Sequence, residues 1–588
     1  MRRRSPRATG TFLLCLLLLL LFSIFSLHLS RNAISTSSLN LNLHYNNDHL
    51  HHSKRALLNE LDDDGLLLHP IARINDSSFS VSVSDSILLP DWEILLILSP
   101  NTPLPPLPLD RQDNYHCLFR NNERSPAKFF AVLPFTNRTT FKCFVPESVR
   151  RRRIFSKPTL VASSSYNESP ELSSSPVPEI LKWNFFVYES FSTDDDVVLF
   201  AKGVNGRQGN DRSPNELNCV FTFEGNGVRN AVKTPVTNSV QEVFRCPHPD
   251  PSELGLGPNY QSLEGQGSEK MTVSLEIIAH NIVVPSVAYY TPRPNKEPNS
   301  IQAQPKYEIC ACTMVYNVAK FLREWVMYHS KVGVDNFLLY DNGSEDELKN
   351  MINELRGEGY NISTLLWIWP KTQEAGFSHS ILYSKSMGMC KWIMYVDVDE
   401  FVFSPLWNNL ENGKHGSLKS LVPQEKRAGQ VSVNCLEFGP SGQKVHPLEG
   451  VTQGYTCRKK VEQRHKSMVL VDAVDPSLWN VIHHFKVNEK GGFVSVQLGL
   501  DKWVVNHYKY QAWDEFKNKF RRRVSAYVVD WKQNVNLNSK DRTPGLGSEA
   551  VEPQDWVNKF CEVRDERLKS FTQKLFGPFR PNQTHAMA

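Results

Sequence analysis

Two aspartates directly follow a run of apolar residues in the second half of the chain. Residues 392–396 read Trp-Ile-Met-Tyr-Val, and Asp397 and Asp399 come next. Such a run predicts a buried strand, and open α/β sheets bind their ligands where the strands end. Two hard oxygen ligands at that position suit Mn²⁺ or Mg²⁺ holding a diphosphate. A calcium loop of the EF-hand kind is disfavoured, because Phe401 and Phe403 follow where oxygen ligands would be needed.

The elements before this pair predict a parallel sheet. Strands are expected at 310–316, 336–340 and 364–369, and an amphipathic helix is expected at 318–331. A second helix follows the turn at 341–343, with apolar residues at helical spacing. Strands that alternate with amphipathic helices are typical of a Rossmann-like α/β domain.

Polar residues stand at the expected strand ends. Asn317 follows the first strand, Asp341 and Asn342 follow the second, and Asp397 and Asp399 follow the central one. The carboxyl ends of parallel strands share one edge of a sheet, so these side chains are expected to converge on one pocket. Taken singly, Asn317 also fits a helix cap, and Asp341 and Asn342 also fit an ordinary turn.

Length and charge limit the classes of function. A chain of 588 residues exceeds one hydrophobic core and predicts two domains with connecting segments. Its 66 basic and 62 acidic residues leave a net charge of +4. So small an excess provides no strong field for nucleic acid, and no nucleic-acid partner is expected.

The first 29 residues predict a membrane segment. Residues 1–10 carry four arginines and no acidic residue, and residues 11–29 are largely apolar. About 18 apolar residues nearly span a ~30 Å hydrocarbon core, and the arginines favour a cytoplasmic N-terminus. We therefore expect a single-pass type II signal anchor in the secretory pathway, with the remaining chain in the lumen. A cleaved signal peptide is the alternative, although no Ala-x-Ala-like site lies near Ser30.

Other features fit the secretory pathway. Ten cysteines lie beyond the membrane segment without any Cys-x-x-Cys pair, which favours disulfides over metal binding. Asn-x-Ser/Thr acceptors for glycosylation begin at Asn75, Asn137, Asn167, Asn361 and Asn582.

The composition divides the lumenal part into regions. Residues 30–80 predict a flexible stem, and residues 81–290 predict an all-β domain of short strands between Pro, Gly and Asn turns. Within it, the cysteine pairs 117/143 and 219/246 have similar spacings, so two strand pairs with one disulfide each is the simplest arrangement among three connectivities. A proline-rich linker at 291–306 precedes the α/β domain at 307–575.

An ordered set of motifs in residues 305–560 resembles glycosyltransferase family 92, which includes plant β-1,4-galactan synthases. The motifs are Cys312-Thr-Met-Val-Tyr-Asn317, Glu324-Trp325, Tyr328-His329, Gly333-Val-Asp335, Tyr340-Asp-Asn-Gly-Ser344-Glu-Asp346, Asp397-Val-Asp-Glu-Phe401, Glu437-Phe-Gly439, Lys466, His484 and Asn506-His507-Tyr508. The resemblance implies a GT-A fold and an inverting, manganese-dependent transfer of galactose from UDP-galactose in β linkage. Galactan is the acceptor by analogy, and the β domain resembles the galactan synthases' carbohydrate-binding module only in position and architecture.

Negative charge builds on the departing diphosphate during such a transfer, and a bound cation offsets this charge. The expected roles of the site residues follow from the need to hold that cation. Asp399 is expected to bind the metal directly, and Asp397 is expected to bind the ribose or a metal-bound water, so both belong to the predicted metal site. His507 is preferred over His484 as a further ligand, although either histidine also fits a hydrogen-bonded core position. The predicted donor-binding residues are Thr313, Asn317, Asp341, Asn342 and Asp397.

An inverting transfer also needs a general base. Glu437 ends a predicted strand at 430–436 and is the candidate, with Asp472 and Asp475 as rivals. Arg521 to Arg523 could bind pyrophosphate, or they could form a solvated helix end.

The expected partners are a UDP-sugar, an oligo- or polysaccharide acceptor and the lipid bilayer, with a homodimer left open. A noncatalytic glycan-binding protein is the alternative function.

Overall fold

The computed structural model describes residues 80–100, 115–150, 155–162, 179–206, 210–225, 228–253, 271–291, 304–409, 416–423, 425–481, 483–519 and 552–578. All of them belong to one compact unit, Asn75–Ala588. The predicted tail, membrane segment and stem up to residue 79 lie outside the described residues, as do most of the linker and residues 521–523. Among the described residues, no helix is long and apolar enough to cross a membrane.

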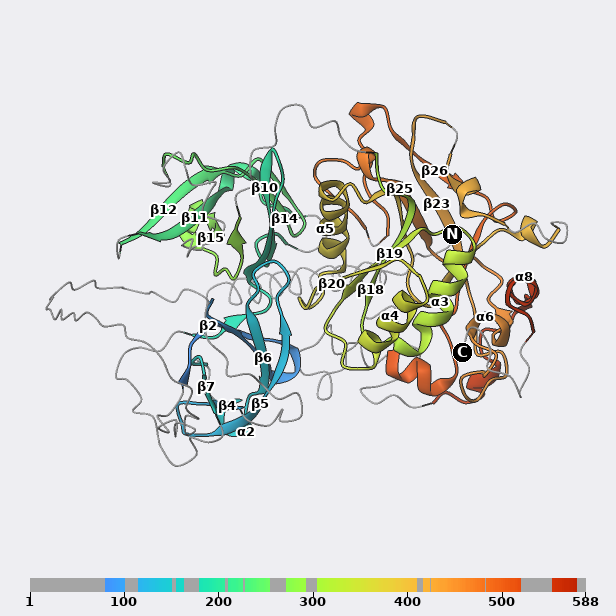
Figure 1. Ribbon diagram of the computed structural model, residues 1–588, viewed down its shortest axis with the longest axis horizontal. Helices are drawn as coiled ribbons and strands as arrows, with labels where there is room; N and C mark the ends of the chain where they lie inside the picture. The colour runs from blue at the N-terminus through green and yellow to red at the C-terminus, as the bar shows by residue number, and fades with distance from the viewer. Residues whose placement is uncertain are drawn as a thin grey trace, which may run out of the picture. The chain divides into compact units, whose positions relative to one another are not determined.

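The first region is an eight-stranded sheet in the order β1-β7-β4-β5-β6-β3-β2-β8 (Figure 1). Its pairs are antiparallel except β2–β8. The apolar strand β3 lies inside the sheet and is buried from Ile94 to Leu98. The elements are β1 (Ser80–Val81), β2 (Val83–Leu88), β3 (Glu93–Leu98), β4 (Tyr115–Leu118), β5 (Arg124–Val132), β6 (Thr139–Phe144), α2 (Glu147–Arg150), β7 (Thr159–Ala162) and β8 (Leu181–Lys182).

The second region is a β sandwich. One sheet has the order β13-β14-β10-β9, and the other has the order β12-β11-β15-β16 with β17 on β15. Side chains from both sheets form one core, which includes Leu199 and Leu275. The strands are β9 (Phe186–Ser192), β10 (Asp196–Lys202), β11 (Leu217–Gly225), β12 (Val228–Pro235), β13 (Asn238–Val240), β14 (Val243–Pro247), β15 (Met271–Ile277), β16 (Ile282–Val283) and β17 (Tyr289–Tyr290).

The two predicted disulfides are confirmed, and the strand-rich character of this part is confirmed with them. Cys117 bonds to Cys143, and Cys219 bonds to Cys246. The predicted strand pairing around each disulfide is wrong, because neither disulfide joins hydrogen-bonded neighbours. β5 lies between β4 and β6, and Cys219 and Cys246 belong to the two different sheets of the sandwich. The second disulfide therefore ties the sandwich together across its core.

The α/β domain begins with a parallel half-sheet. Strands β18 (Tyr307–Val315), β19 (Asn336–Asp341), β20 (Ile362–Leu366) and β21 (Cys390–Tyr395) lie in the order β20-β19-β18-β21. Helices α3 (Ala319–Lys331) and α4 (Leu348–Gly357) share one core with one face of β18, and α5 (Gln373–Ser386) shares another core with the other face. This is the Rossmann-like half that the sequence predicts.

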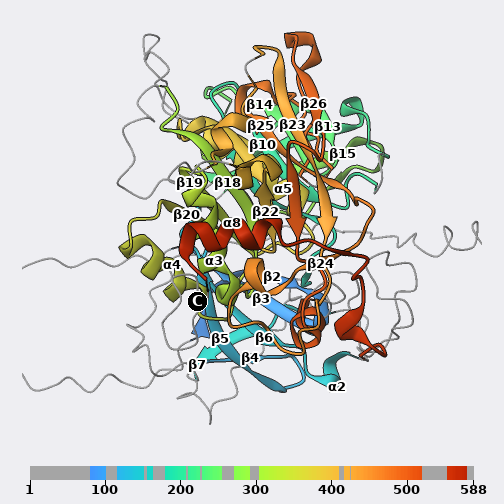
Figure 2. The ribbon, with the colours of Figure 1, turned by 90° about the vertical axis from the view of Figure 1, so that its right-hand side faces the viewer.

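The sheet continues with strands from later in the chain, in the order β21-β25-β23-β27-β22. These strands are β22 (Glu400–Phe403), β23 (Ala428–Glu437), β25 (His465–Leu470) and β27 (Val504–His507), with β26 (Val494–Leu498) also on β23. A short sheet pairs β24 (Cys457–Arg458) with β28 (Val563–Arg564). Helix α8 (Arg567–Phe576), red in Figure 2, packs on α6 (Val451–Gly454). The central strand β21 therefore has a parallel neighbour on one side and an antiparallel one on the other.

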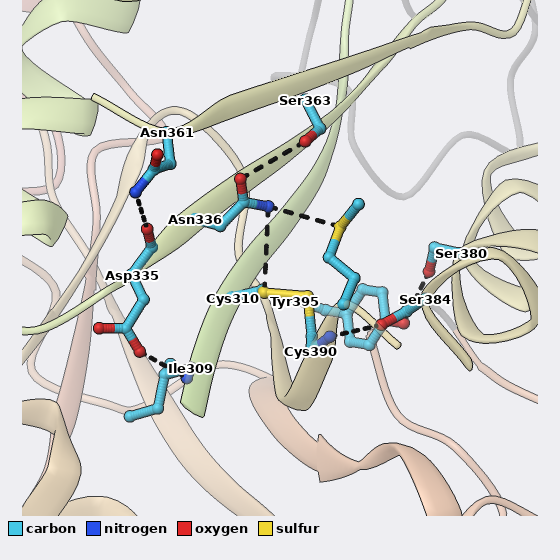
Figure 3. The surroundings of a disulfide bond; sticks show 11 residues. Ile309, Cys310, Asp335, Asn336, Asn361, Ser363, Ser380, Ser384, Cys390 and Tyr395 are labelled. Carbon is cyan, nitrogen blue, oxygen red and sulfur yellow. Dashed lines mark hydrogen bonds between the residues drawn. A yellow bond between two sulfur atoms is a disulfide. The ribbon is translucent and has the colours of Figure 1, made fainter. Parts of the chain in front are cut away.

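Two further disulfides lie in the α/β domain. Cys310 bonds to Cys390 at the start of β21, and Cys457 bonds to Cys561. The Asn336 amide points to the sulfur of Cys310, and the Cys390 N–H donates to Ser384 Oγ at 3.1 Å (Figure 3). The covalent tie between β18 and β21 thus lies at the opposite end of β21 from the aspartates.

Candidate active site

The chain turns sharply between β21 and β22, and this turn separates the two aspartates. The Glu400 N–H donates to the Asp397 carbonyl at 3.0 Å, and the Asp397 N–H donates to Glu400 Oε2 at 2.9 Å. A continuing strand would place Asp397 and Asp399 on one face. The turn instead gives each carboxylate its own set of partners.

Asp397 faces two basic side chains. Its Oδ2 lies 3.0 Å from Lys466 Nζ and 3.4 Å from His483 Nε2. Lys466 also lies 2.8 Å from Glu400 Oε2, so one buried ammonium holds two carboxylates. Burial alone would raise the pKa of Asp397, but Lys466 and His483 lower this pKa well below its usual range. Asp397 is therefore an ionised group inside an ion-pair network.

Asp399 faces His507. Its Oδ2 lies 3.3 Å from His507 Nε2, and the same oxygen contacts Lys519 Nζ. The Tyr508 N–H donates to the Asp399 carbonyl at 2.9 Å, which fixes the turn on β27. Burial would raise the pKa of Asp399, but Lys519 and His507 lower it below its usual range. The predicted pairing of Asp399 with a late histidine is thus present in the structure.

Glu400 completes a group that could hold a metal ion. Ligand atoms of Asp399, Glu400 and His507 all lie within 4.8 Å of one another. The Glu400 side chain is fully buried, and its Oε1 has no hydrogen-bond partner among the described residues and lies 3.5 Å from His507 Nδ1. Two carboxylates and an imidazole are a donor set that suits Mn²⁺. The residues present therefore fit a divalent cation between Asp399 and His507 Nε2, with Glu400 on the Nδ1 side of the same imidazole. The metal role of Asp397 stays a prediction.

Strand pairing brings these residues together from distant segments. His507 in β27 lies opposite Glu400 in β22 on one side and opposite Glu437 in β23 on the other. No local spacing in the sequence relates these three residues, and the sheet order alone makes them neighbours.

Glu437 lies between two lysines. Its carboxylate is 2.7 Å from Lys459 Nζ and 2.9 Å from Lys509 Nζ. Burial would raise the pKa of Glu437, but the two lysines lower the pKa to about 2. A carboxylate with so low a pKa is a weak proton acceptor. The base role of Glu437 stays a prediction, and this environment does not favour it.

The other residues considered for the base and the metal have different surroundings. Asp472 is largely exposed beside Lys385, and Asp475 accepts hydrogen bonds from Ser477. His484 lies among Gln430, Ser432, His465 and Ser467. His484 is thus the hydrogen-bonded histidine, and His507 is the one that faces the carboxylates.

The predicted donor-pocket residues Asn317, Asp341 and Asn342 bind backbone groups of the loops at this edge of the sheet. Asn317 Oδ1 accepts from the N–H groups of Glu345 and Asp346 at 2.8 and 3.3 Å. Asp341 Oδ1 accepts from the Ser344 N–H at 2.9 Å. These side chains hold the β18–α3 and β19–α4 loops together.

Asn342 explains why the third strand ends early. Its Nδ2 donates to the carbonyls of Trp367 and Trp369 at 2.6 and 3.3 Å, so β20 ends at Leu366 instead of the predicted residue 369.

Thr313 differs from the loop residues: it is fully buried in β18, and its Oγ1 has no hydrogen-bond partner among the described residues.

Sequence reasoning gave no role to Glu400, His483 or Lys519, and included Lys466 only as a family motif. Glu400 could have been considered, since it belongs to the same acidic stretch as Asp397 and Asp399. Lys519 lies 120 residues from Asp399 in the sequence, and no motif around Lys519 indicates this contact.

Comparisons with known proteins identify the class. The family model described as glycosyltransferase family 92 matches residues 306–540. A family 92 protein of Oryza sativa subsp. japonica is 40% identical over 401 residues, which are 67% of this chain and 67% of that protein. One from Ricinus communis is 35% identical over 530 residues, 87% of each chain. The chain belongs to glycosyltransferase family 92. Membership supports a role in glycosyl transfer and does not favour the noncatalytic alternative.

Solved structures give a much weaker likeness. Glucosyl-3-phosphoglycerate synthase from Mycobacterium tuberculosis matches 38% of this chain and 78% of that chain, with 12% identity and a TM-score of 0.20. A match of that size supports no argument about substrate or mechanism.

Proposed function

We propose that this protein is an inverting galactosyltransferase, which transfers galactose from UDP-galactose to a glycan acceptor in β linkage, with β-1,4-galactan as the acceptor. The observation that carries a metal-dependent transfer is the facing pair of Asp399 and His507 Nε2, 3.3 Å apart, at the end of the central strand. The donor sugar and the acceptor rest on the resemblance to the galactan synthases.

Each charged residue around the proposed metal ion has a separate role. Asp399 and His507 Nε2 would hold Mn²⁺, which when bound offsets the negative charge that develops on the departing diphosphate. Glu400 faces the other ring nitrogen, so it orients the imidazole and keeps Nε2 turned toward Asp399. Lys466 pairs with both Glu400 and Asp397 and offsets their negative charge.

The proposed location is the Golgi membrane, with residues 11–29 as the anchor and the α/β domain in the lumen. Asn137 and Asn361 are exposed acceptors in the described residues. A lumenal domain predicts that a glycosidase shifts the mobility of the protein. It also predicts that sealed vesicles protect the protein from protease, and digestion in intact vesicles would contradict the location.

The proposed reaction is tested with the purified full chain. UDP release is measured with a panel of UDP-sugars and galactan oligosaccharides, with and without Mn²⁺. We expect UDP-galactose to be preferred, and we expect activity to require Mn²⁺ and to fall at least about 100-fold in Asp399→Asn. Glu308→Gln is the matched control, since Glu308 is an exposed carboxylate paired with Lys391 at 3.1 Å. Equal activity of Asp399→Asn and wild type would refute the proposal.

A further inference from the structure

Lys519 reaches the metal-facing carboxylate from a remote part of the chain. It belongs to the helical residues 513–519, and its ammonium contacts Asp399 Oδ2. That oxygen is the one that faces His507 Nε2 at 3.3 Å. Both side chains of the ion pair are mostly buried, with 24% of Lys519 and 16% of Asp399 exposed. The Lys519 ammonium therefore occupies the position beside Asp399 Oδ2 that a metal ion would take.

Asp399 Oδ2 cannot bind a divalent cation while it is paired with the Lys519 ammonium. Mn²⁺ and Mg²⁺ lie about 2.0–2.2 Å from a carboxylate oxygen, and an ammonium lies about 2.7–2.9 Å from it. A metal ion and a lysine ammonium that contact the same carboxylate oxygen therefore lie close together, and they repel each other strongly in a partly buried site. Binding of a metal at Asp399 therefore requires the Lys519 ammonium to leave.

The charges of the site show what the displaced lysine would meet. Among the described side chains, four carboxylates pair with four ammonium groups, so these charges balance before any ligand binds. The carboxylates are Asp397, Asp399, Glu400 and Glu437, and the ammonium groups are Lys459, Lys466, Lys509 and Lys519. A divalent cation adds two positive charges, which a nucleoside diphosphate would offset.

Lys519 differs from the other three lysines in its partner. Lys466 is held between Asp397 and Glu400, and Lys459 and Lys509 share Glu437. A metal at Asp399 would therefore leave the ion pairs of these three lysines in place and would disrupt the Lys519 pair.

We propose that Lys519 is an exchangeable counter-ion, which pairs with Asp399 in the donor-free enzyme, yields this carboxylate to the divalent cation, and then binds the diphosphate of the nucleotide sugar. The inference deepens the proposed function and rests on it, because it requires a metal and a diphosphate at the same site. It assigns Lys519 two opposing effects, one on metal affinity and one on nucleotide affinity.

The test separates these effects in the full-length protein. Affinity for Mn²⁺ alone is measured by electron paramagnetic resonance of the unbound ion, and affinity for UDP at saturating Mn²⁺ is measured by calorimetry. We expect Lys519→Met to bind Mn²⁺ about five- to tenfold more tightly than wild type and UDP about tenfold more weakly. Lys519→Arg keeps the charge and should stay near wild type for both ligands. Lys391→Met is the matched control, because it removes an exposed ammonium that is paired with Glu308 at 3.1 Å.

The failures of this inference and of the proposed function are distinguishable. If wild type binds Mn²⁺ and Lys519→Met binds it equally or more weakly, the counter-ion role is overturned and the metal site stands. Unchanged UDP affinity in Lys519→Met also overturns the inference. If wild type binds no Mn²⁺, both the inference and the metal-dependent function fail. A thermal unfolding curve for each variant confirms that the folded protein is being compared.

Discussion

Two loop clusters at the same edge of the sheet use polar residues in different ways. After β18 and β19, Asn317 and Asp341 accept hydrogen bonds from backbone N–H groups, and Asn342 donates to backbone carbonyls. After β21, Asp397 and Asp399 face charged or titratable side chains. A backbone partner stays in place when a ligand arrives, whereas a side-chain cation can be exchanged for another cation. The first cluster therefore builds the loops, and the second has the exchangeable partners that the proposed ligand site requires.

The largest expected effect contrasts one aspartate from each cluster. Asp399→Asn should lower the rate of sugar transfer at least about 100-fold, because the amide cannot neutralise a metal ion. Asp341→Asn keeps an oxygen that can accept from the Ser344 N–H, so its rate should stay within about tenfold of wild type. Initial rates with UDP-galactose check both values, and similar losses in the two variants would remove the contrast between the clusters.

A second test compares the two carboxylates that flank His507 on adjacent strands. Glu400→Gln should weaken Mn²⁺ binding about 10- to 100-fold, because Glu400 orients the imidazole through Nδ1. Glu437→Gln should change Mn²⁺ affinity less than about threefold, since the partners of Glu437 are Lys459 and Lys509. Metal titrations of both variants measure these affinities. A larger loss of Mn²⁺ affinity in Glu437→Gln than in Glu400→Gln would show that Glu437, and not Glu400, supports the metal site.

The loop-building cluster should affect stability more than binding. Asn317→Ala leaves the N–H groups of Glu345 and Asp346 without their acceptor, so the free energy of unfolding should fall by about 2 kcal/mol. Mn²⁺ affinity should remain that of wild type. Urea unfolding and metal titration of the same sample measure both quantities. A stable variant that has lost metal binding would place Asn317 in the ligand site.

The last expected effect concerns a histidine outside both loop clusters. His329 is fully buried, and burial lowers its pKa from 6.5 to about 3, so it is neutral in the folded chain. The unfolded chain binds a proton at this residue near pH 6.5, so the stabilisation is present above pH 6.5 and declines as the pH falls toward 3. Acidification from pH 7 to 5 should cost about 2 kcal/mol through this residue. His329→Gln should reduce the loss between these pH values, and an unchanged loss would contradict the assignment.

The parts of the fold that follow from local pattern could be predicted. Apolar spacing gave helix α3, and similar cysteine spacings of 26 and 27 residues gave the first two disulfides. The bonds Cys310–Cys390 and Cys457–Cys561 close separations of 80 and 104 residues, and no local signal connects them.

The site shows the same limit. Asp399 and His507 could be predicted from residue type and from the family motifs. The separation of Asp397 from Asp399 could not, because it depends on the turn before β22. Glu400 and Lys519 reach His507 and Asp399 through strand order and through a distant helix, which a spacing rule does not reveal.

The most direct measurement of the central claim is the position of a bound metal. Crystals of the protein with MnCl₂ and UDP, measured at the manganese absorption edge, should give an anomalous density peak between Asp399 Oδ2 and His507 Nε2. Lys466 should remain between Asp397 and Glu400 in the same crystals. A peak beside Asp397 with Asp399 still paired to Lys519, or no peak at saturating Mn²⁺, would contradict the assignment of the exchangeable charges to Asp399.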